Sequence, residues 1–300
     1  MIIKKTHISV CICTYKRPEL LRKLLLALGE QVTDGLFSYS VVVADNDKEE
    51  TARKIVELFK INKDICISYH TEPRRNIALV RNKVVEKATG DFLAFIDDDE
   101  LPENTWLFHL YSAIEKYQVD AILAPVRPRF EHIPPSWVEK GHFFKRPEYQ
   151  TGRLMKFGEC RTGNVLIRKR SIDCLDIPFD EKYESGSEDV DFFRRFINHG
   201  KTVIWCNEAP VYELVPPQRC TRKYLLRLAL LRGGNSFKHK EGRIKGVTKA
   251  FLAIPLYFLA LPFLYIVGEQ YFLKYLVKLC DHFGRLTKAF GITIIRERTM

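Results

Sequence analysis

The chain has 300 residues, 46% of them hydrophobic and 28% charged, which excludes a wholly disordered protein and leaves room for one large domain or two small ones. Its eight cysteines are scattered without a CxxC pair, which argues against a zinc-binding or disulfide-stabilised fold and predicts reduced thiols in a cytosolic compartment. The net charge of +11 is uneven, because residues 1–218 carry 32 Lys/Arg and 33 Asp/Glu whereas residues 219–300 carry 16 and 4, so the last quarter is expected to meet an anionic partner.

The first 125 residues alternate strand-like and helix-like segments. The N-terminus shows no signal-peptide pattern and leads directly into the first strand. Apolar runs predict strands at 7–13, 39–44, 65–69, 92–96 and 121–125. Apolar residues three to four positions apart predict four helices. The first starts at Pro18, the second includes Ile55, and the third and fourth cover about 76–88 and 103–117. Strands that alternate with such helices indicate βαβ units, so we expect an α/β fold with a mostly parallel central sheet flanked by helices. Residues 126–187 are less regular and are expected to form a substrate-facing lobe.

A run of four carboxylates follows the fourth predicted strand. The strand reads FLAFI without polar alternation, which predicts burial on both faces, and Asp97, Asp98, Asp99 and Glu100 come directly after it. Adjacent carboxylates repel one another unless a cation lies between them, and ligands of open α/β sheets bind at the carboxyl ends of strands. Mg²⁺ and Mn²⁺ prefer such oxygen ligands and leave positions open for phosphate. We therefore expect a metal site that holds a phosphorylated ligand; a solvated acidic turn before a helix is the alternative.

Polar side chains also follow the first two predicted strands, as TYKR after the first and DND after the second. Tyr15 offers an aromatic ring for a base, and Arg17 offers a cation for a phosphate. Asp45 or Asp47 offers a carboxylate that can accept a hydrogen bond from a base or a ribose. In a parallel sheet these ends share one edge with the acidic run. The chain contains no GxxxxGK[ST], which excludes a P-loop, and no GxGxxG follows the first strand. The pattern therefore predicts a nucleoside-diphosphate pocket built from loops.

Four blocks of the sequence, in this order, resemble glycosyltransferase family 2. They are SVCICTYKR at 9–17, NIALVRN at 76–82, ATGDFLAFIDDD at 88–99 and GSEDVDFFRR at 186–195. The segment RTGN at 161–164 resembles the Gly-Asn segment that family members place near the acceptor. The resemblance covers about residues 7–235 and is greatest to bacterial exopolysaccharide and lipopolysaccharide transferases of the succinoglycan glucosyltransferase type. It implies a GT-A fold, a nucleotide-sugar donor, a divalent metal and inverting transfer.

The resemblance also implies roles for individual residues. The residues implied in nucleotide-sugar binding are Thr14, Tyr15, Arg17, Asp45, Asp47, Arg81, Asp97 and Asp98. Asp97 and Asp99 are the implied DxD ligands of Mn²⁺ or Mg²⁺, with Asp98 as an alternative to Asp97. Asp189 is the implied catalytic base, and the implied acceptor-side or secondary residues are Gly163, Asn164 and Glu188. From the residues alone, Glu188 and Asp189 are also compatible with plain helix capping.

Residues 250–268 form a 19-residue stretch without a charge, flanked on both sides by lysines or arginines. Its length is just sufficient for a membrane span, but Pro255 and Pro262 are expected to kink a helix, and basic residues on both flanks disfavour crossing. We therefore expect a helix or kinked hairpin lying on an anionic cytoplasmic leaflet. A true span and a buried helix of the globular domain are the alternatives. No groove-reading pattern accompanies the charge, which argues against nucleic acid as the partner.

The resemblance implies a GT-A catalytic domain over residues 1–218, and the charge and apolar patterns predict a basic, helical, membrane-associating extension over 219–300. The expected function is an inverting, metal-dependent hexosyltransferase on the cytoplasmic face of the cell membrane, with a UDP-sugar as donor and a glycan or lipid-linked acceptor. A polyprenyl-phosphate glycosyltransferase and a catalytically inactive nucleotide-binding protein at the membrane are the alternatives. The QxxRW block of processive synthases is missing, because QRCTR at 218–222 lacks the Trp, so we expect a single sugar to be added per encounter.

Overall fold

The chain divides into two compact units. The structure, a computed structural model, describes residues 5–62, 65–184, 186–237 and 243–295. The first unit comprises Met1–Arg127, Arg146–Glu184 and Glu188–Leu214, and the second comprises Pro128–Lys145, Ser185–Ser187 and Val215–Met300. The second unit therefore includes residues 128–145, which the sequence analysis placed in the first domain. The physical reason is apolar packing, because Trp137 and Val138 share a buried cluster with Tyr224, Leu225 and Leu273.

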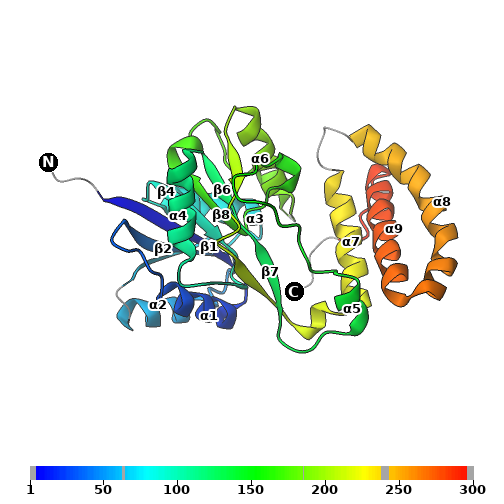
Figure 1. Ribbon diagram of the computed structural model, residues 1–300, viewed down its shortest axis with the longest axis horizontal. Helices are drawn as coiled ribbons and strands as arrows, with labels where there is room; N and C mark the ends of the chain where they lie inside the picture. Colours follow the sequence, from blue (N-terminus) through cyan, green and yellow to red (C-terminus); the bar gives the residue numbers. More distant parts are fainter. Residues whose placement is uncertain (1–4, 63–64, 185, 238–242, 296–300) are drawn as a thin grey trace. The chain divides into compact units, whose positions relative to one another are not determined.

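The first unit is built on a seven-stranded sheet (Figure 1). Its strands, in spatial order, are β3 (Cys66–Thr71), β2 (Phe37–Asp45), β1 (Thr6–Thr14), β4 (Phe92–Ile96), β8 (Asn164–Arg168), β6 (Ala121–Leu123) and β9 (Val203–Trp205). Neighbouring strands run parallel except at β8, which is antiparallel to both β4 and β6. The central strand is β4, and all five of its residues are buried, as its apolar run predicts.

Alternate residues of the strands enter two separate hydrophobic cores, one on each face of the sheet. In β4, Phe92 and Ala94 belong to the first core, and Leu93 and Phe95 belong to the second. The first core is completed by helices α1 (Pro18–Leu28), α2 (Arg53–Asn62) and α4 (Trp106–Tyr117), and the second by α3 (Ile77–Lys87) and α6 (Glu188–Asn198). The predicted α/β architecture is therefore confirmed, with a sheet that is mixed but mostly parallel.

Several elements were not predicted from the sequence. Strand β8 lies within the segment expected to be irregular, and β9 was missed. The sequence also did not predict a second sheet, which contains β5 (Glu100–Pro102), β10 (Val211–Val215) and β7 (Val126–Phe130), although the run at 209–215 is strand-like and corresponds to β10. Because β5 starts at Glu100, the acidic run ends in a paired strand, and Glu100 lies opposite Glu213 of β10.

The second unit is helical. Its helices are α5 (Ser136–Lys140), α7 (Arg222–Ser236), α8 (Arg243–Val267) and α9 (Glu269–Ala289), and α9 lies between α7 and α8 (Figure 1). Two glycines allow α7 and α9 to approach closely, because a Cβ added at Gly233 or Gly284 would collide with the backbone of Asp281 or Leu230, respectively. Helix α8 continues through both Pro255 and Pro262, so neither proline forms the turn of the kinked hairpin that was considered for this stretch. The turn between α8 and α9 is at Gly268.

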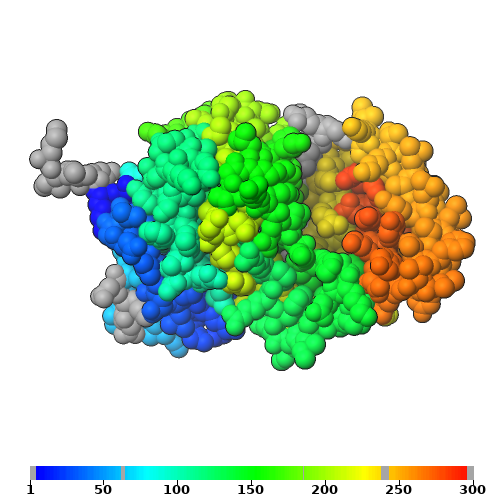
Figure 2. All heavy atoms as spheres, in the orientation of Figure 1, coloured from blue at the N-terminus to red at the C-terminus, as the bar shows by residue number. Residues whose placement is uncertain are grey.

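Helix α8 exposes most of its apolar side chains. Within the described part of the chain it is the one helix that is long and apolar enough to cross a membrane. Leu256, Phe258, Leu259 and Phe263 are each about two-thirds exposed or more, and α8 forms the orange surface in Figure 2. The alternative in which this stretch is a buried helix of the globular domain is therefore not observed.

Candidate active site

The acidic run meets the end of β1. Thr14 Oγ1 donates to Asp98 Oδ2 at 2.8 Å, and Arg17 Nη1 lies 3.1 Å from Asp98 Oδ1 and 3.3 Å from Asp99 Oδ2. Both carboxylates are buried. Burial raises the pKa of Asp98 to about 7, although the Arg17 charge opposes the rise. The first and third sequence blocks therefore meet, as expected for neighbouring parallel strands, but Asp98 and Asp99 turn toward Arg17.

Asp97 is the exposed member of the run. Its side chain is 44% exposed, and Oδ1 lies 3.5 Å from Arg81 Nη2 of α3. The Asp97 backbone N–H donates to Glu100 Oε2 at 3.1 Å, which fixes the start of the loop. Of the three aspartates, Asp97 is thus the one whose carboxylate is free to meet a ligand from solvent.

Glu100 ends the acidic run, and the sequence analysis gave it no role of its own. It is 1% exposed, and its Oε1 has no hydrogen-bond partner among the described residues. Burial raises the pKa of Glu100 well above its usual value, and the nearby Asp97 raises it further. A Cβ added at Gly163 would lie 2.8 Å from Glu100 Oε1 and 3.4 Å from Asp97 Oδ2. The glycine of the RTGN segment therefore makes room for two carboxylates.

The two aspartates at the end of β2 differ in their hydrogen bonds. Asp45 is fully buried; its Oδ1 accepts from the Asp47 N–H at 2.9 Å, and its Oδ2 accepts from the Ala52 N–H at 3.0 Å and from Tyr69 Oη at 2.8 Å. Asp47 Oδ2, in contrast, is buried without a partner among the described residues. Asp45 thus holds the loop in its conformation through three hydrogen bonds, whereas Asp47 Oδ2 is a hydrogen-bond acceptor without a donor among the described residues.

The Tyr15 ring lies beside two cations. Arg75 Cζ is 4.9 Å and Lys16 Nζ is 5.6 Å from the ring centroid, and Lys16 Nζ is also 3.9 Å from Asp47 Oδ1. These strand ends therefore bring together an aromatic face, two cations and a carboxylate acceptor. An aromatic face suits a base, and cations suit a phosphate.

Arg81 connects the acidic run to the start of α6. Besides its contact with Asp97, its Nη1 forms an ion pair with Glu188, the first residue of α6. Arg81 and Glu188 are both buried, and Glu188 Oε2 has no partner among the described residues. Glu188 is therefore an ion-pair partner of Arg81 through one of its two carboxylate oxygens.

Asp189 lies in the first turn of α6. Its Oδ1 accepts from the Val190 N–H at 2.8 Å, and its Oδ2 is 3.8 Å from Arg161 Nε. Its side chain is 16% exposed. These two contacts hold Asp189 in a defined position while its side chain remains accessible.

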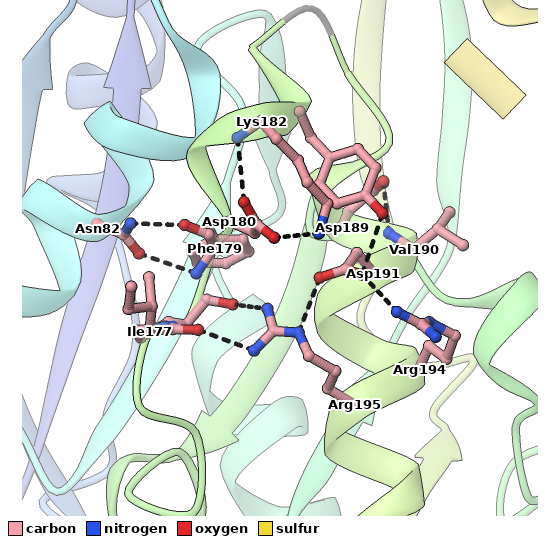
Figure 3. A network of polar contacts seen from close by, with 12 residues as sticks. Asn82, Ile177, Phe179, Asp180, Lys182, Asp189, Val190, Asp191, Arg194 and Arg195 are labelled. Atoms are coloured by element: carbon pink, nitrogen blue, oxygen red, sulfur yellow. Dashed lines mark hydrogen bonds and ion pairs between the residues drawn. The ribbon is translucent and has the colours of Figure 1, made fainter. Parts of the chain in front are cut away.

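A network of polar contacts fixes this turn (Figure 3). Asp191 accepts from Arg194 Nη2 at 2.7 Å and from Arg195 Nε at 2.8 Å, and Tyr183 Oη lies 3.2 Å away. Hydrogen bonds from the two arginines lower the pKa of Asp191 although its burial would raise it. The remaining donors of Arg195 reach the Ile177 and Pro178 carbonyl oxygens at 2.8 and 2.5 Å.

The same loop is held from the other side by α3. Asn82 donates through Nδ2 to the Phe179 carbonyl oxygen at 2.7 Å and accepts from the Phe179 N–H at 2.9 Å (Figure 3). The second sequence block therefore supports the fourth, because neighbouring Arg81 and Asn82 both brace the segment that leads to Asp189.

Asn164 differs from the sequence expectation. It is 2% exposed; its Oδ1 accepts from Trp106 Nε1 at 2.8 Å, and its Nδ2 donates to the Pro125 and Ala209 carbonyl oxygens at 2.9 and 2.8 Å. The whole amide is used by the protein itself. Asn164 therefore joins β8 to its surroundings and does not face an acceptor, whereas Gly163 lies against the carboxylates.

Among the described residues, no group of three His, Cys, Asp or Glu side chains converges on a metal site. Asp98 and Asp99 are engaged with Arg17, which leaves Asp97 as the accessible carboxylate. Mg²⁺ is commonly held by one or two carboxylates together with substrate phosphates and water. The oxygen donors present fit that kind of site and not a cage made by the protein alone.

Comparison with known proteins identifies a family. The profile described as Glycosyl transferase family 2 matches residues 9–175. The succinoglycan biosynthesis protein ExoM of Rhizobium meliloti (strain 1021) is 36% identical over 225 residues, which cover 74% of this chain and 71% of ExoM.

Solved structures show the same fold. S. aureus TarS 1–349 in complex with UDP has a TM-score of 0.57 at 16% identity, covering 96% of this chain and 93% of that one. GalNAc-T7 with UDP, GalNAc and Mn²⁺ has a TM-score of 0.56 at 14% identity, over 71% of this chain and 44% of that one. These likenesses support the GT-A fold that the sequence blocks imply.

Proposed function

Because the chain belongs to glycosyltransferase family 2, we propose that it transfers a hexose, with inversion, from a UDP-sugar to a glycan or lipid-linked acceptor in cell-surface polysaccharide synthesis. The biosynthetic role named for ExoM supports the pathway, and the UDP held by TarS supports the donor. The observation that carries the proposal is the position of Arg81, which contacts both Asp97 and Glu188. The donor-facing loop and the turn bearing Asp189 therefore meet at one side chain.

In this proposal Asp189 accepts the proton of the acceptor hydroxyl. A hydroxyl is a poor nucleophile near pH 7, and a positioned base typically contributes about 10²–10⁴-fold to the rate. The Val190 N–H and the Arg161 side chain contact the Asp189 carboxylate and orient it. Attack on the face opposite the leaving diphosphate then inverts the sugar in a single displacement.

The donor nucleotide is held at the ends of β1 and β2. The Tyr15 ring supplies a face for the base, and Asp47 Oδ2 accepts an N–H from the base or a hydroxyl from the ribose. Arg17 supplies positive charge for the diphosphate beside Thr14, while Asp45 holds the loop in place through its own hydrogen bonds. In this proposal the ends of both strands contribute groups to the nucleotide.

Mn²⁺ or Mg²⁺ is the proposed cofactor, with Asp97 and Asp99 as its ligands. Asp97 is accessible as it stands, whereas Asp99 would have to exchange its contact with Arg17 for the ion. The metal, when bound, supplies a Lewis acid that neutralises charge on the diphosphate. Asp97 is exposed for this purpose, and Arg81 keeps its carboxylate near the start of α6. GalNAc-T7, solved with Mn²⁺ and UDP, supports the choice of metal.

We place the enzyme at the cytoplasmic face of the cell membrane. The exposed apolar side chains of α8 and the excess of Lys/Arg over residues 219–300 are suited to an anionic lipid surface. Such an anchor confines the enzyme to the surface where a lipid-linked acceptor is held.

The test of the proposal is Asp189→Asn, assayed for transfer and for UDP binding in Mn²⁺. Transfer should fall by about 10²–10⁴-fold, because the amide cannot take the proton. UDP affinity should be retained. Asp173→Asn, an exposed position in the same unit, is the matched control. Undiminished transfer by Asp189→Asn would exclude Asp189 as the base.

A further inference from the structure

The helical unit contains a basic cavity that lies outside the candidate active site. The cavity has a volume of about 290 Å³ and is bounded by α7, α8 and α9. Its charged and titratable lining side chains are Arg232, Lys249, Lys278, Asp281, His282 and Arg285. Four cations therefore face one carboxylate. None of these residues belongs to the donor, metal or base positions described above.

The single carboxylate does not offset this charge. Asp281 Oδ1 accepts from Arg232 Nε at 2.7 Å, so its charge is matched by that arginine. Lys249 forms no ion pair with any residue in the described ranges, and Lys278 lies 4.6 Å from the Tyr275 ring centroid without a carboxylate partner in those ranges. Three cations thus remain for a ligand.

Arg285 is held in position at the cavity. Its Nε donates to Ser236 Oγ at 2.8 Å, and its Nη1 is 3.5 Å from the Gly246 carbonyl oxygen. A Cβ at Gly246 would lie 3.4 Å from Arg285 Cδ and Nη1, so the glycine allows the side chain to pass along α8. A guanidinium fixed in this way loses little entropy when it binds an anion.

His282 provides a second, independent sign of a ligand. Its side chain is 8% exposed and lines the cavity, with its ring centroid 5.7 Å from that of Tyr257. Its Nδ1 is buried and has no hydrogen-bond partner among the described residues. Buried polar atoms are nearly always satisfied, and an unsatisfied one costs about 1–3 kcal/mol. A group with hydrogen-bonding oxygens in the cavity would meet this requirement.

We propose that this cavity binds the phosphate group of a membrane lipid, as a phosphomonoester or diphosphate. A fixed arginine, two exposed lysines and an imidazole with an unsatisfied nitrogen form a donor set suited to phosphate oxygens. The ligand is a lipid because α8, which contributes Lys249 and Tyr257 to the cavity, also carries the exposed Leu252, Leu256 and Leu259. The phosphate contacts the basic cavity while the hydrocarbon lies along the apolar side chains. This binding does not depend on the transfer reaction.

The test is binding of the full chain to vesicles of phosphatidylcholine that contain either phosphatidic acid, a phosphomonoester, or phosphatidylglycerol, a phosphodiester, at matched surface charge. The wild-type chain should prefer phosphatidic acid. Lys249→Gln with Lys278→Gln should weaken binding to phosphatidic acid by roughly 30-fold, the equivalent of about 1 kcal/mol for each lysine. Both lysines are exposed, so the variant is expected to fold, which far-UV circular dichroism checks.

The matched control is Lys245→Gln with Lys274→Gln, which removes two exposed charges one helical turn away on the same two helices and outside the cavity. The control should keep the preference for phosphatidic acid. Equal loss in both double variants, or no preference in the wild-type chain, would show diffuse surface charge and overturn the proposal. Inorganic pyrophosphate is the soluble probe: if it raises the melting temperature as much as phosphatidic acid vesicles do, the ligand is a free phosphate compound and not a lipid.

Discussion

Gly163→Ala tests whether the space beside the acidic run is required. The glycine precedes β8, and an added Cβ would lie 2.8 Å from Glu100 Oε1 and 3.4 Å from Asp97 Oδ2. The first distance is shorter than van der Waals contact. Glu100 cannot move freely to relieve it, because its side chain is 1% exposed and its Oε2 accepts from the Asp97 N–H at 3.1 Å. The added methyl group must therefore displace Glu100 or β8.

Overpacking of this kind typically costs about 1–3 kcal/mol. The loss should appear in the free energy of unfolding measured with urea. Because Glu100 also holds the Asp97 N–H, its displacement should move the donor-facing loop as well. Affinity for UDP in Mn²⁺, measured by calorimetry, should then weaken by about tenfold, the equivalent of about 1.4 kcal/mol.

Gly158→Ala is the matched control, because a Cβ added there meets no described atom within 4 Å. It should change neither quantity by more than about 0.5 kcal/mol. A double-mutant cycle identifies the cause: in a Glu100→Ala background the Cβ has lost its main obstacle, so Gly163→Ala should cost much less. An unchanged cost in that background would refute the clash with Glu100, and wild-type stability of Gly163→Ala would refute the whole argument.

Three further predictions concern the aspartates of the site. Asp47→Ala should weaken UDP affinity by about tenfold or more without loss of stability, because a hydrogen bond to a charged acceptor is worth about 1.5–3 kcal/mol and Oδ2 has no partner among the described residues; unchanged affinity in calorimetry would exclude Asp47 as the acceptor. Asp191→Asn should lower the free energy of unfolding by about 1.5–3 kcal/mol, because it removes the charged acceptor of the hydrogen bonds from Arg194 and Arg195; urea denaturation checks this, and a loss below 1 kcal/mol would contradict it. In the metal-free protein, the raised pKa of Asp98 makes the free energy of unfolding depend on pH: the contribution of protonated Asp98 is fully present below about pH 4 and is lost as the pH rises through about 7. Asp98→Asn should flatten this decline of the free energy of unfolding, measured with urea at a series of pH values. An unchanged slope would assign the decline to other groups.

The sequence predicted which strand ends meet because apolar runs identify buried strands, and parallel neighbours share an edge. Thr14 and Asp98 are 84 positions apart, yet they hydrogen-bond because β1 and β4 are adjacent and parallel. The same reasoning could not find β8, since an antiparallel strand inserted into the sheet follows no βαβ pattern. Its apolar run, Val165-Leu166-Ile167, was the available signal.

The sequence could not determine which way individual polar side chains turn. Gly163 and Asn164 are adjacent, yet the Asn164 amide hydrogen-bonds to Trp106 and to two carbonyl oxygens, whereas Gly163 lies against Glu100. Asp45 and Asp47 differ in the same way at the end of β2. These differences arise from long-range contacts, which no local pattern records.

Charge repulsion within the acidic run was the sequence argument for a metal, and the structure shows a second way to offset it. Arg17 lies between Asp98 and Asp99, and Arg81 lies between Asp97 and Glu188. Two arginines thus supply the cations that the carboxylates need for folding. Repulsion alone therefore does not require a permanently bound metal, and the exposed Asp97 suits an ion that arrives with the phosphates of the donor. We therefore propose that the acidic run and the two arginines form a site whose charge balance is completed by its ligand.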